Sequence, residues 1–141
     1  MNAVPKQADF ALYRNRAAEL TELREIIQRD SYETGEQYTL ASGRVSDIYF
    51  NMKPSIMPFR GNWLAAREFL RIAQERKAEF IGGLEMGAVP IISSVAGLSG
   101  EYGDGITAFF VRKKPKTHGA RLLVEGLPKS TSLEGRRVLM A

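Results

Sequence analysis

Residues 78–98 read AEFIGGLEMGAVPIISSVAGL, and this stretch contains a strand, a turn and a helix in succession. Ala78 to Gly83 is short and apolar, which is typical of a buried strand. This strand runs into a glycine-bearing turn. Ala88 to Leu98 then has a helical pattern with Pro90 in its first turn, where a missing N–H costs little. Together these elements predict the first half of a parallel crossover unit.

The chain downstream continues the alternation. Ile106 to Val111 is apolar and aromatic and predicts a second buried strand, followed by a basic loop to about Arg121. Leu122 to Glu125 predicts a short strand, and Arg137 to Ala141 begins another. The pattern indicates an α/β fold with a mainly parallel sheet flanked by helices, and such sheets bind ligands at the carboxyl ends of their strands.

The chain upstream predicts two helices and a strand pair. A helix is expected from about Phe10 to Asp30, and a second from about Gly61 to Lys77, after Pro54 and Pro58 interrupt the chain. Between them, Tyr38 to Asn51 predicts two short strands around a turn. The apolar residues expected to form the buried stripe of the first helix are Tyr13, Ala17, Leu20, Leu23 and Ile27.

Length and composition indicate one globular domain. The 141 residues are 44% hydrophobic and 26% charged, and they contain neither a signal-peptide pattern nor an apolar run long enough to span a membrane. We therefore expect a cytoplasmic protein that does not bind membranes. Cysteine is absent, which excludes disulfides, thiolate catalysis and cysteine metal sites.

The net charge of +4 is concentrated in one loop. Residues 112–121 contain five basic residues and no acid, which leaves 15 basic and 16 acidic residues elsewhere. A protein that binds nucleic acid through its surface would need a broader basic face. We therefore expect no nucleic-acid partner.

The basic loop suits an anion with many oxygens, such as diphosphate. Within FVRKKPKTHGARLLVEG, Phe110 to Gly126, a predicted strand leads directly into arginine, lysines and the chain's one histidine. Arginine offers a planar fork, lysine a mobile point charge, and histidine a proton near neutral pH. A solvated charged loop is the alternative interpretation. A metal site is not predicted, because His118 has no partner histidine at ligand spacing.

Two further stretches carry weaker signals. TLASGR at residues 39–44 is followed by SDIYF at 46–50, and GGLEMGAVP occupies 82–90. The glycines of the second stretch would let backbone amides near a helix N-terminus approach an anion. Each stretch taken alone is more typical of an ordinary structural element, such as a turn, than of a binding site.

In this order and spacing, the three stretches resemble orotate phosphoribosyltransferases of the type I phosphoribosyltransferase fold. Leu40 to Phe50, Gly83 to Pro90 and Arg112 to Gly119 correspond to the family's motifs, and the resemblance covers about residues 10–141. It implies one phosphoribosyltransferase-like domain over 1–141. Residues 1–60 would form an N-terminal helix and hood-like strands, and residues 61–141 the α/β core.

The resemblance implies transfer of a phosphoribosyl group from 5-phosphoribosyl 1-diphosphate (PRPP) to orotate, which gives orotidine 5′-monophosphate and diphosphate in pyrimidine (UMP) biosynthesis. Mg²⁺ would bind with PRPP. The family works as a homodimer in which the loop from Lys113 to Ala120 closes over the neighbour's active site. Orotate would contact Tyr49 and Phe50, and Lys113, Lys116 and His118 would be catalytic. The residues expected to bind the diphosphate are Arg112, Lys113, Lys116, His118 and Gly87.

The sequence departs from the family pattern in three places. Ala41 and Gly87 stand where many members have lysine, so backbone amides would have to supply those phosphate contacts. The family's ribose-phosphate loop would follow Ala141, which implies a truncated chain without activity of its own.

Three alternatives remain open at the level of sequence. The chain could be a non-catalytic descendant of the fold that senses nucleotides or dimerises, or a nucleic-acid-binding module that uses its basic loop. A phosphoribosyltransferase for a purine or for uracil is a third, although such relatives do not usually carry the RKxxKxHG loop.

Overall fold

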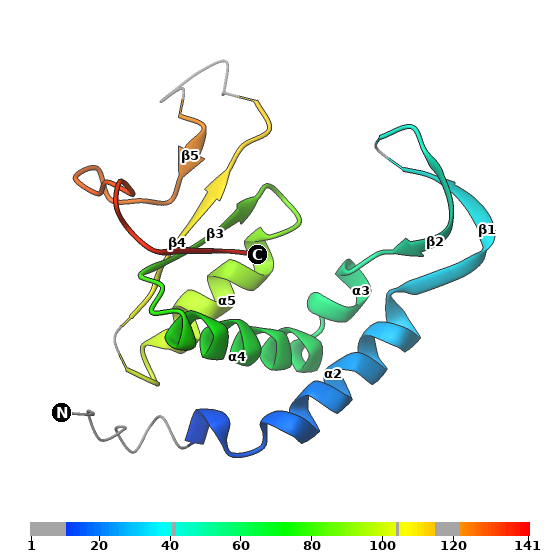
Figure 1. Ribbon diagram of the computed structural model, residues 1–141, viewed down its shortest axis with the longest axis horizontal. Coiled ribbons are helices and arrows are strands. Elements are labelled where there is room, and N and C mark those ends of the chain that lie inside the picture. Colours follow the sequence, from blue (N-terminus) through cyan, green and yellow to red (C-terminus); the bar gives the residue numbers. More distant parts are fainter. Residues whose placement is uncertain (1–10, 41, 104, 115–121) are drawn as a thin grey trace.

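The computed structural model describes residues 11–40, 42–103, 105–114 and 122–141 (Figure 1). A four-stranded sheet with two helices beside it forms the body, and a two-stranded hairpin stands apart from that sheet at the far end of a long helix. Among the described residues, no helix combines the length and the apolar character that a membrane crossing requires.

The sheet has the mainly parallel character that the sequence predicts. Its strand order is β5-β4-β3-β6, and β3 runs parallel to both β4 and β6, whereas β5 pairs with β4 in the antiparallel sense. The α/β fold is therefore confirmed. The strands are β3 (Phe80–Leu84), β4 (Thr107–Val111), β5 (Val124–Glu125) and β6 (Val138–Met140).

Helices α4 (Phe59–Glu75) and α5 (Val89–Ser99) build the core with the sheet. Helix α5 packs on β3 and β4, and α4 packs on α5. Burial of a leucine, isoleucine or valine side chain contributes about 1.5–3 kcal/mol to the free energy of folding. The apolar contacts of α4, α5 and the sheet therefore dominate the stability of the body. Its most deeply buried side chains include Leu70, Ile81, Ile92 and Val95.

Two consecutive glycines in β3 are required by close packing. A Cβ at Gly82 would lie 2.3 Å from the ring of Phe109, and a Cβ at Gly83 would lie 2.2 Å from the Cβ of Ala88. Neither neighbour can yield easily, because one is a buried ring and the other belongs to the turn before α5. Gly82 thus makes room for the ring of Phe109 from β4, and Gly83 lets the turn before α5 approach the strand.

The predicted strand pair is an antiparallel hairpin of β1 (Tyr32–Thr39) and β2 (Val45–Phe50). Gly43 forms its turn with a φ of +80°, a conformation that glycine adopts at no steric cost. Strand β1 begins at Tyr32, earlier than predicted. The prediction missed its first residues because this polar sequence lacks the alternation of apolar residues that indicates a strand. Aromatic pairs cross the hairpin: the ring centroids of Tyr32 and Phe50 lie 5.2 Å apart.

Helix α2 (Arg16–Asp30) confirms the predicted helix, but the predicted buried stripe is correct only in part: Tyr13 and Leu23 are half-buried and pack against the core. Ala17 and Leu20 are exposed, and the most buried residues of this segment are Leu12, Glu19 and Ile26. Helix α2 is therefore rotated about its axis relative to the predicted orientation. The buried Glu19 faces α4, whereas Leu20 is exposed.

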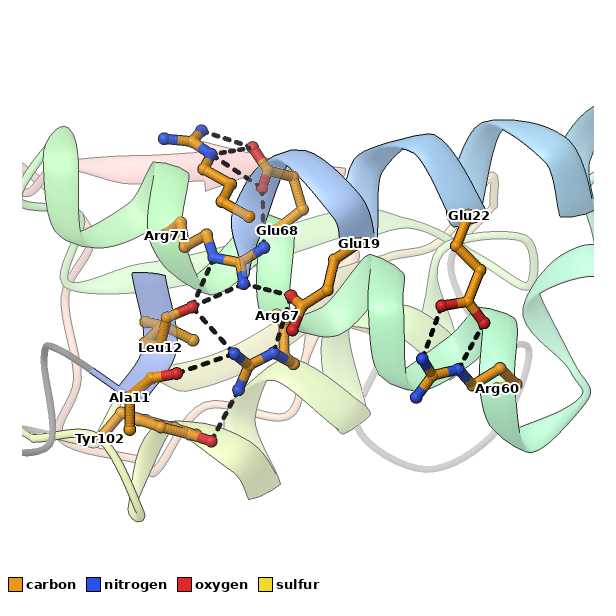
Figure 2. Close-up of polar contacts among 10 residues, drawn as sticks. Ala11, Leu12, Glu19, Glu22, Arg60, Arg67, Glu68, Arg71 and Tyr102 are labelled. Atoms are coloured by element: carbon orange, nitrogen blue, oxygen red, sulfur yellow. Dashed lines mark hydrogen bonds and ion pairs between the residues drawn. The ribbon is translucent and has the colours of Figure 1, made fainter. Parts of the chain in front are cut away.

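That glutamate belongs to a buried polar network between α2 and α4 (Figure 2). Arg67 and Arg71, one turn apart on α4, both pair with Glu19, and the Arg67 contact measures 3.0 Å. Both guanidinium groups also donate to the carbonyl oxygen of Leu12, at 2.9 and 2.6 Å. Because these donors satisfy the carbonyl oxygens of Ala11 and Leu12, the network fixes the segment before α2, and with it α2, on α4.

Candidate functional site

A pocket of about 360 Å³ lies between the hairpin and the turn after β3. It brings Tyr49 and Phe50, from the end of β2, together with Gly87, from the β3–α5 turn. Two sequence motifs that were separate predictions therefore meet in space. The residues that line the pocket are Tyr49, Phe50, Asn51, Met52, Lys53, Ile56, Met57, Met86, Gly87 and Pro90.

The hairpin side of the pocket is held by a short helix that the sequence did not predict, α3 (Lys53–Ile56). Ser55 of this helix is fully buried, and its Oγ lies 2.5 Å from the Oγ of Ser31. A Cβ at Gly61 would lie 1.9 Å from the Ser55 carbonyl oxygen, so α4 approaches α3 closely. Pro54 is accommodated because the first turn of a helix needs no N–H donor.

The opposite side of the pocket is the turn between β3 and α5. Its Glu85–Met86 peptide bond is cis. An ideal Cβ at Gly87 would have no atom within 4 Å, so the backbone of this residue faces open space. A ligand can therefore approach the backbone amides at the start of α5, as an anion would require.

The carboxyl end of β4 lies next to this turn and is tied to it by Glu85. Arg112 pairs with Glu85 at 3.1 Å and with Glu125 at 3.3 Å. The backbone N–H of Lys113 donates to Glu85 Oε1 at 3.1 Å, whereas the Lys113 side chain is exposed. The basic loop thus leaves the sheet beside the glycine turn.

The structure brings some predicted site residues together and leaves others apart. Tyr49, Phe50 and Gly87 share the pocket, while Arg112 and Lys113 adjoin its glycine turn without lining it. Lys116 and His118 lie outside the described residues.

Sequence reasoning missed Lys53 and Glu85. Lys53 could have been noticed as a cation shortly after the aromatic pair, but the contacts of Glu85 depend on strand order and had no sequence signal. Among the described residues, no group of three or more His, Cys, Asp or Glu is placed to hold a metal ion.

Comparison with known proteins places the chain among one group of enzymes, although no protein-family model matches it. It is 48% identical over 126 residues to the orotate phosphoribosyltransferase of Bradyrhizobium diazoefficiens, a match that covers 89% of this chain and 67% of that protein.

Solved structures agree with this result. The chain is similar to Mycobacterium tuberculosis orotate phosphoribosyltransferase in complex with Fe(III) dicitrate, with a TM-score of 0.64 and 32% identity over 86% of this chain and 65% of that one. The same enzyme in complex with PRPP gives a TM-score of 0.61 and 28% identity over 86% of this chain and 62% of that one. The chain thus spans about two thirds of the length of these relatives.

Proposed function

Because the chain belongs to the orotate phosphoribosyltransferase family, we propose that it serves the transfer of a phosphoribosyl group from PRPP to N1 of orotate. The products are orotidine 5′-monophosphate and diphosphate, a step of pyrimidine biosynthesis. The observation that supports this proposal most strongly is that Phe50 and Gly87 line the same pocket. An aromatic side chain therefore lies beside a turn whose backbone is accessible to a ligand.

The two sides of the pocket divide the substrates between them. Tyr49 and Phe50 hold the flat pyrimidine ring, because aromatic side chains offer large apolar faces at low entropic cost. Gly87 and the cations that follow β4 hold the diphosphate of the donor. The ion pair between Glu85 and Arg112 joins the β3–α5 turn to the end of β4, so the groups proposed to bind the diphosphate are held together.

The reaction breaks the C1–O bond of the donor and forms a bond from C1 to N1 of orotate, which loses its proton. Positive character develops on the ribose and negative charge on the departing diphosphate. Lys113, Lys116 and His118 are the proposed catalytic groups, since cations aimed at the leaving group stabilise the transition state more than the ground state. Magnesium is proposed to enter bound to PRPP.

The proposal includes a cytoplasmic homodimer in which the loop of one subunit covers the site of the other. Closure of such a loop would exclude water that otherwise attacks the ribose. Most of this loop lies outside the described residues, so its role here rests on family membership.

Binding is the primary test, because the chain spans about two thirds of its relatives' length. Calorimetric titrations with orotate and with PRPP and Mg²⁺ should each show saturable binding, and Phe50→Ala should weaken orotate binding only. A parallel assay measures orotidine 5′-monophosphate formed from both substrates. A chain that bound neither orotate nor PRPP would refute the proposed function.

A further inference from the structure

We propose that Lys53 binds the carboxylate of orotate and so selects orotate over uncharged pyrimidines, an inference that rests on the proposed function. Among the described residues that line the pocket, Lys53 is the one that carries a charge. The other lining residues are aromatic, aliphatic or neutral, so the pocket has apolar walls and a single cation.

The backbone of Lys53 is held firmly while its side chain is left available. Lys53 is the first residue of α3, and its carbonyl oxygen accepts the N–H of Met57 at 2.9 Å. Two residues further on, Ser55 anchors the helix through Ser31 and the Ile26 carbonyl. No described residue forms an ion pair or hydrogen bond with the Lys53 ammonium group, so its charge can serve a ligand.

The chemistry of orotate fits this arrangement. Its planar ring suits the aromatic wall of Tyr49 and Phe50, but its carboxylate cannot enter an apolar pocket without a compensating charge. The guanidinium of Arg112 is already flanked by Glu85 and Glu125. Lys53 therefore supplies the cation within the lining, and uracil, which lacks the carboxylate, gains nothing from it.

Asn51 adds a second polar group to the same lining. Its Oδ1 is buried and has no hydrogen-bond partner among the described residues. Buried amide oxygens are normally satisfied, and an N–H of the pyrimidine ring is a donor of the required kind. The pocket thus offers an acceptor for the ring as well as a cation for its carboxylate.

The test compares orotate and uracil by calorimetric titration in the presence of Mg²⁺ and inorganic diphosphate. Three variants are used: Lys53→Gln, Lys53→Arg and Lys129→Gln, the last removing an exposed lysine that does not line the pocket. Loss of one charge-assisted contact should weaken orotate binding by roughly tenfold or more in Lys53→Gln. Uracil binding should not change, Lys53→Arg should retain most of the orotate affinity, and Lys129→Gln should match the unsubstituted protein.

The outcomes separate this inference from the proposed function. If the unsubstituted protein binds orotate and PRPP, and Lys53→Gln keeps the same ratio of orotate to uracil affinity, the assignment of Lys53 is overturned and the function stands. If the unsubstituted protein binds neither substrate, both fall. Thermal unfolding of each variant shows whether it is folded, and should Lys53→Gln not fold, a loss of orotate preference in Lys53→Arg would overturn the assignment.

Discussion

Arg112 and Glu85 form an ion pair that joins the end of β4 to the turn after β3, with 3.1 Å between Nη1 and Oε2. Glu125 lies 3.3 Å from the same nitrogen. Within the described part of the chain, no such carboxylate pairs with the side chain of Lys113. Adjacent cations of one motif thus differ in role: Arg112 organises the root of the basic loop, and Lys113 is available to a ligand.

This difference predicts opposite responses to substitution. Arg112→Gln should lower the free energy of unfolding by about 1–2 kcal/mol, because it removes the cation that pairs with both Glu85 and Glu125 at the end of β4. Lys113→Gln should change stability by less than about 0.5 kcal/mol yet weaken diphosphate binding. Urea unfolding and calorimetry with diphosphate measure the two quantities. Equal stability losses in the two variants would contradict the assignment.

The open space at Gly87 predicts that a lysine is tolerated there and improves anion binding. Gly87→Lys meets no atom within 4 Å of its Cβ and adds a cation beside the proposed diphosphate position, so diphosphate affinity should rise several-fold, as one added ion pair allows. Gly97→Lys on α5 is the matched control: its Cβ is equally unobstructed, but it lies further along the helix. Similar affinity for both variants would argue against Gly87 as a diphosphate-binding residue.

The buried glutamate of the α2–α4 network predicts acid sensitivity. Burial alone would raise the pKa of Glu19, but hydrogen bonds from Arg67 and Arg71 outweigh burial and hold that pKa below its ordinary value of 4.5. A carboxylate with a depressed pKa in the folded protein stabilises it fully above the unfolded pKa. The free energy of unfolding should therefore fall as the pH drops below about 4.5, and this part of the fall should be absent in Glu19→Gln.

The same substitution should be costly at neutral pH. Glu19→Gln removes the carboxylate that Arg67 and Arg71 share, although Arg71 keeps its contact with Glu68 at 3.1 Å, and breaking a buried pair typically costs about 3–5 kcal/mol. Glu22→Gln is the control, since the Glu22–Arg60 pair is exposed and its loss should have a much smaller effect. Comparable losses of unfolding free energy in the two variants, measured with urea, would show that the buried network does not anchor α2.

The loop residues assigned by resemblance predict a kinetic effect. In a version of the protein extended to the full length of its relatives, Lys116→Ala or His118→Ala should reduce turnover by about 10²-fold, the usual result of removing one preorganised group that stabilises developing charge. Lys114→Ala removes a neighbouring cation at a variable position of the motif and should have a smaller effect. Steady-state formation of orotidine 5′-monophosphate is the measurement, and unchanged turnover and donor affinity in Lys116→Ala would reject its assignment.

The body of the fold could be predicted from sequence because its signals are local. The strand, glycine turn and helix from Ala78 to Leu98 each have their own pattern, and Gly83 marks the close approach of the strand to the start of the helix. Helix α2 shows where local signals fail. Its buried face is determined by contacts of Glu19 with Arg67 and Arg71, which lie far along the chain. The spacing of Leu20 and the other apolar residues therefore predicted the helix but not the orientation of its buried face.

The candidate site was predicted only in part for the same reason. Tyr49, Phe50 and Gly87 were found by motif, whereas Lys53 and Glu85 acquire their places through tertiary packing. Lys53 reaches the pocket because Ser55 anchors α3 to the end of α2 and Gly61 lets α4 approach α3 closely. Glu85 meets Arg112 because β3 and β4 are parallel neighbours. No pattern of residue spacing encodes either relationship.

The central claim is that the pocket between the hairpin and the β3–α5 turn binds orotate. A crystal structure of the protein with orotate and Mg²⁺-diphosphate tests it most directly. We expect the pyrimidine ring against Phe50, with its carboxylate toward Lys53 and the diphosphate beside Gly87. Orotate bound elsewhere on the protein, with this pocket left to solvent, would contradict the account.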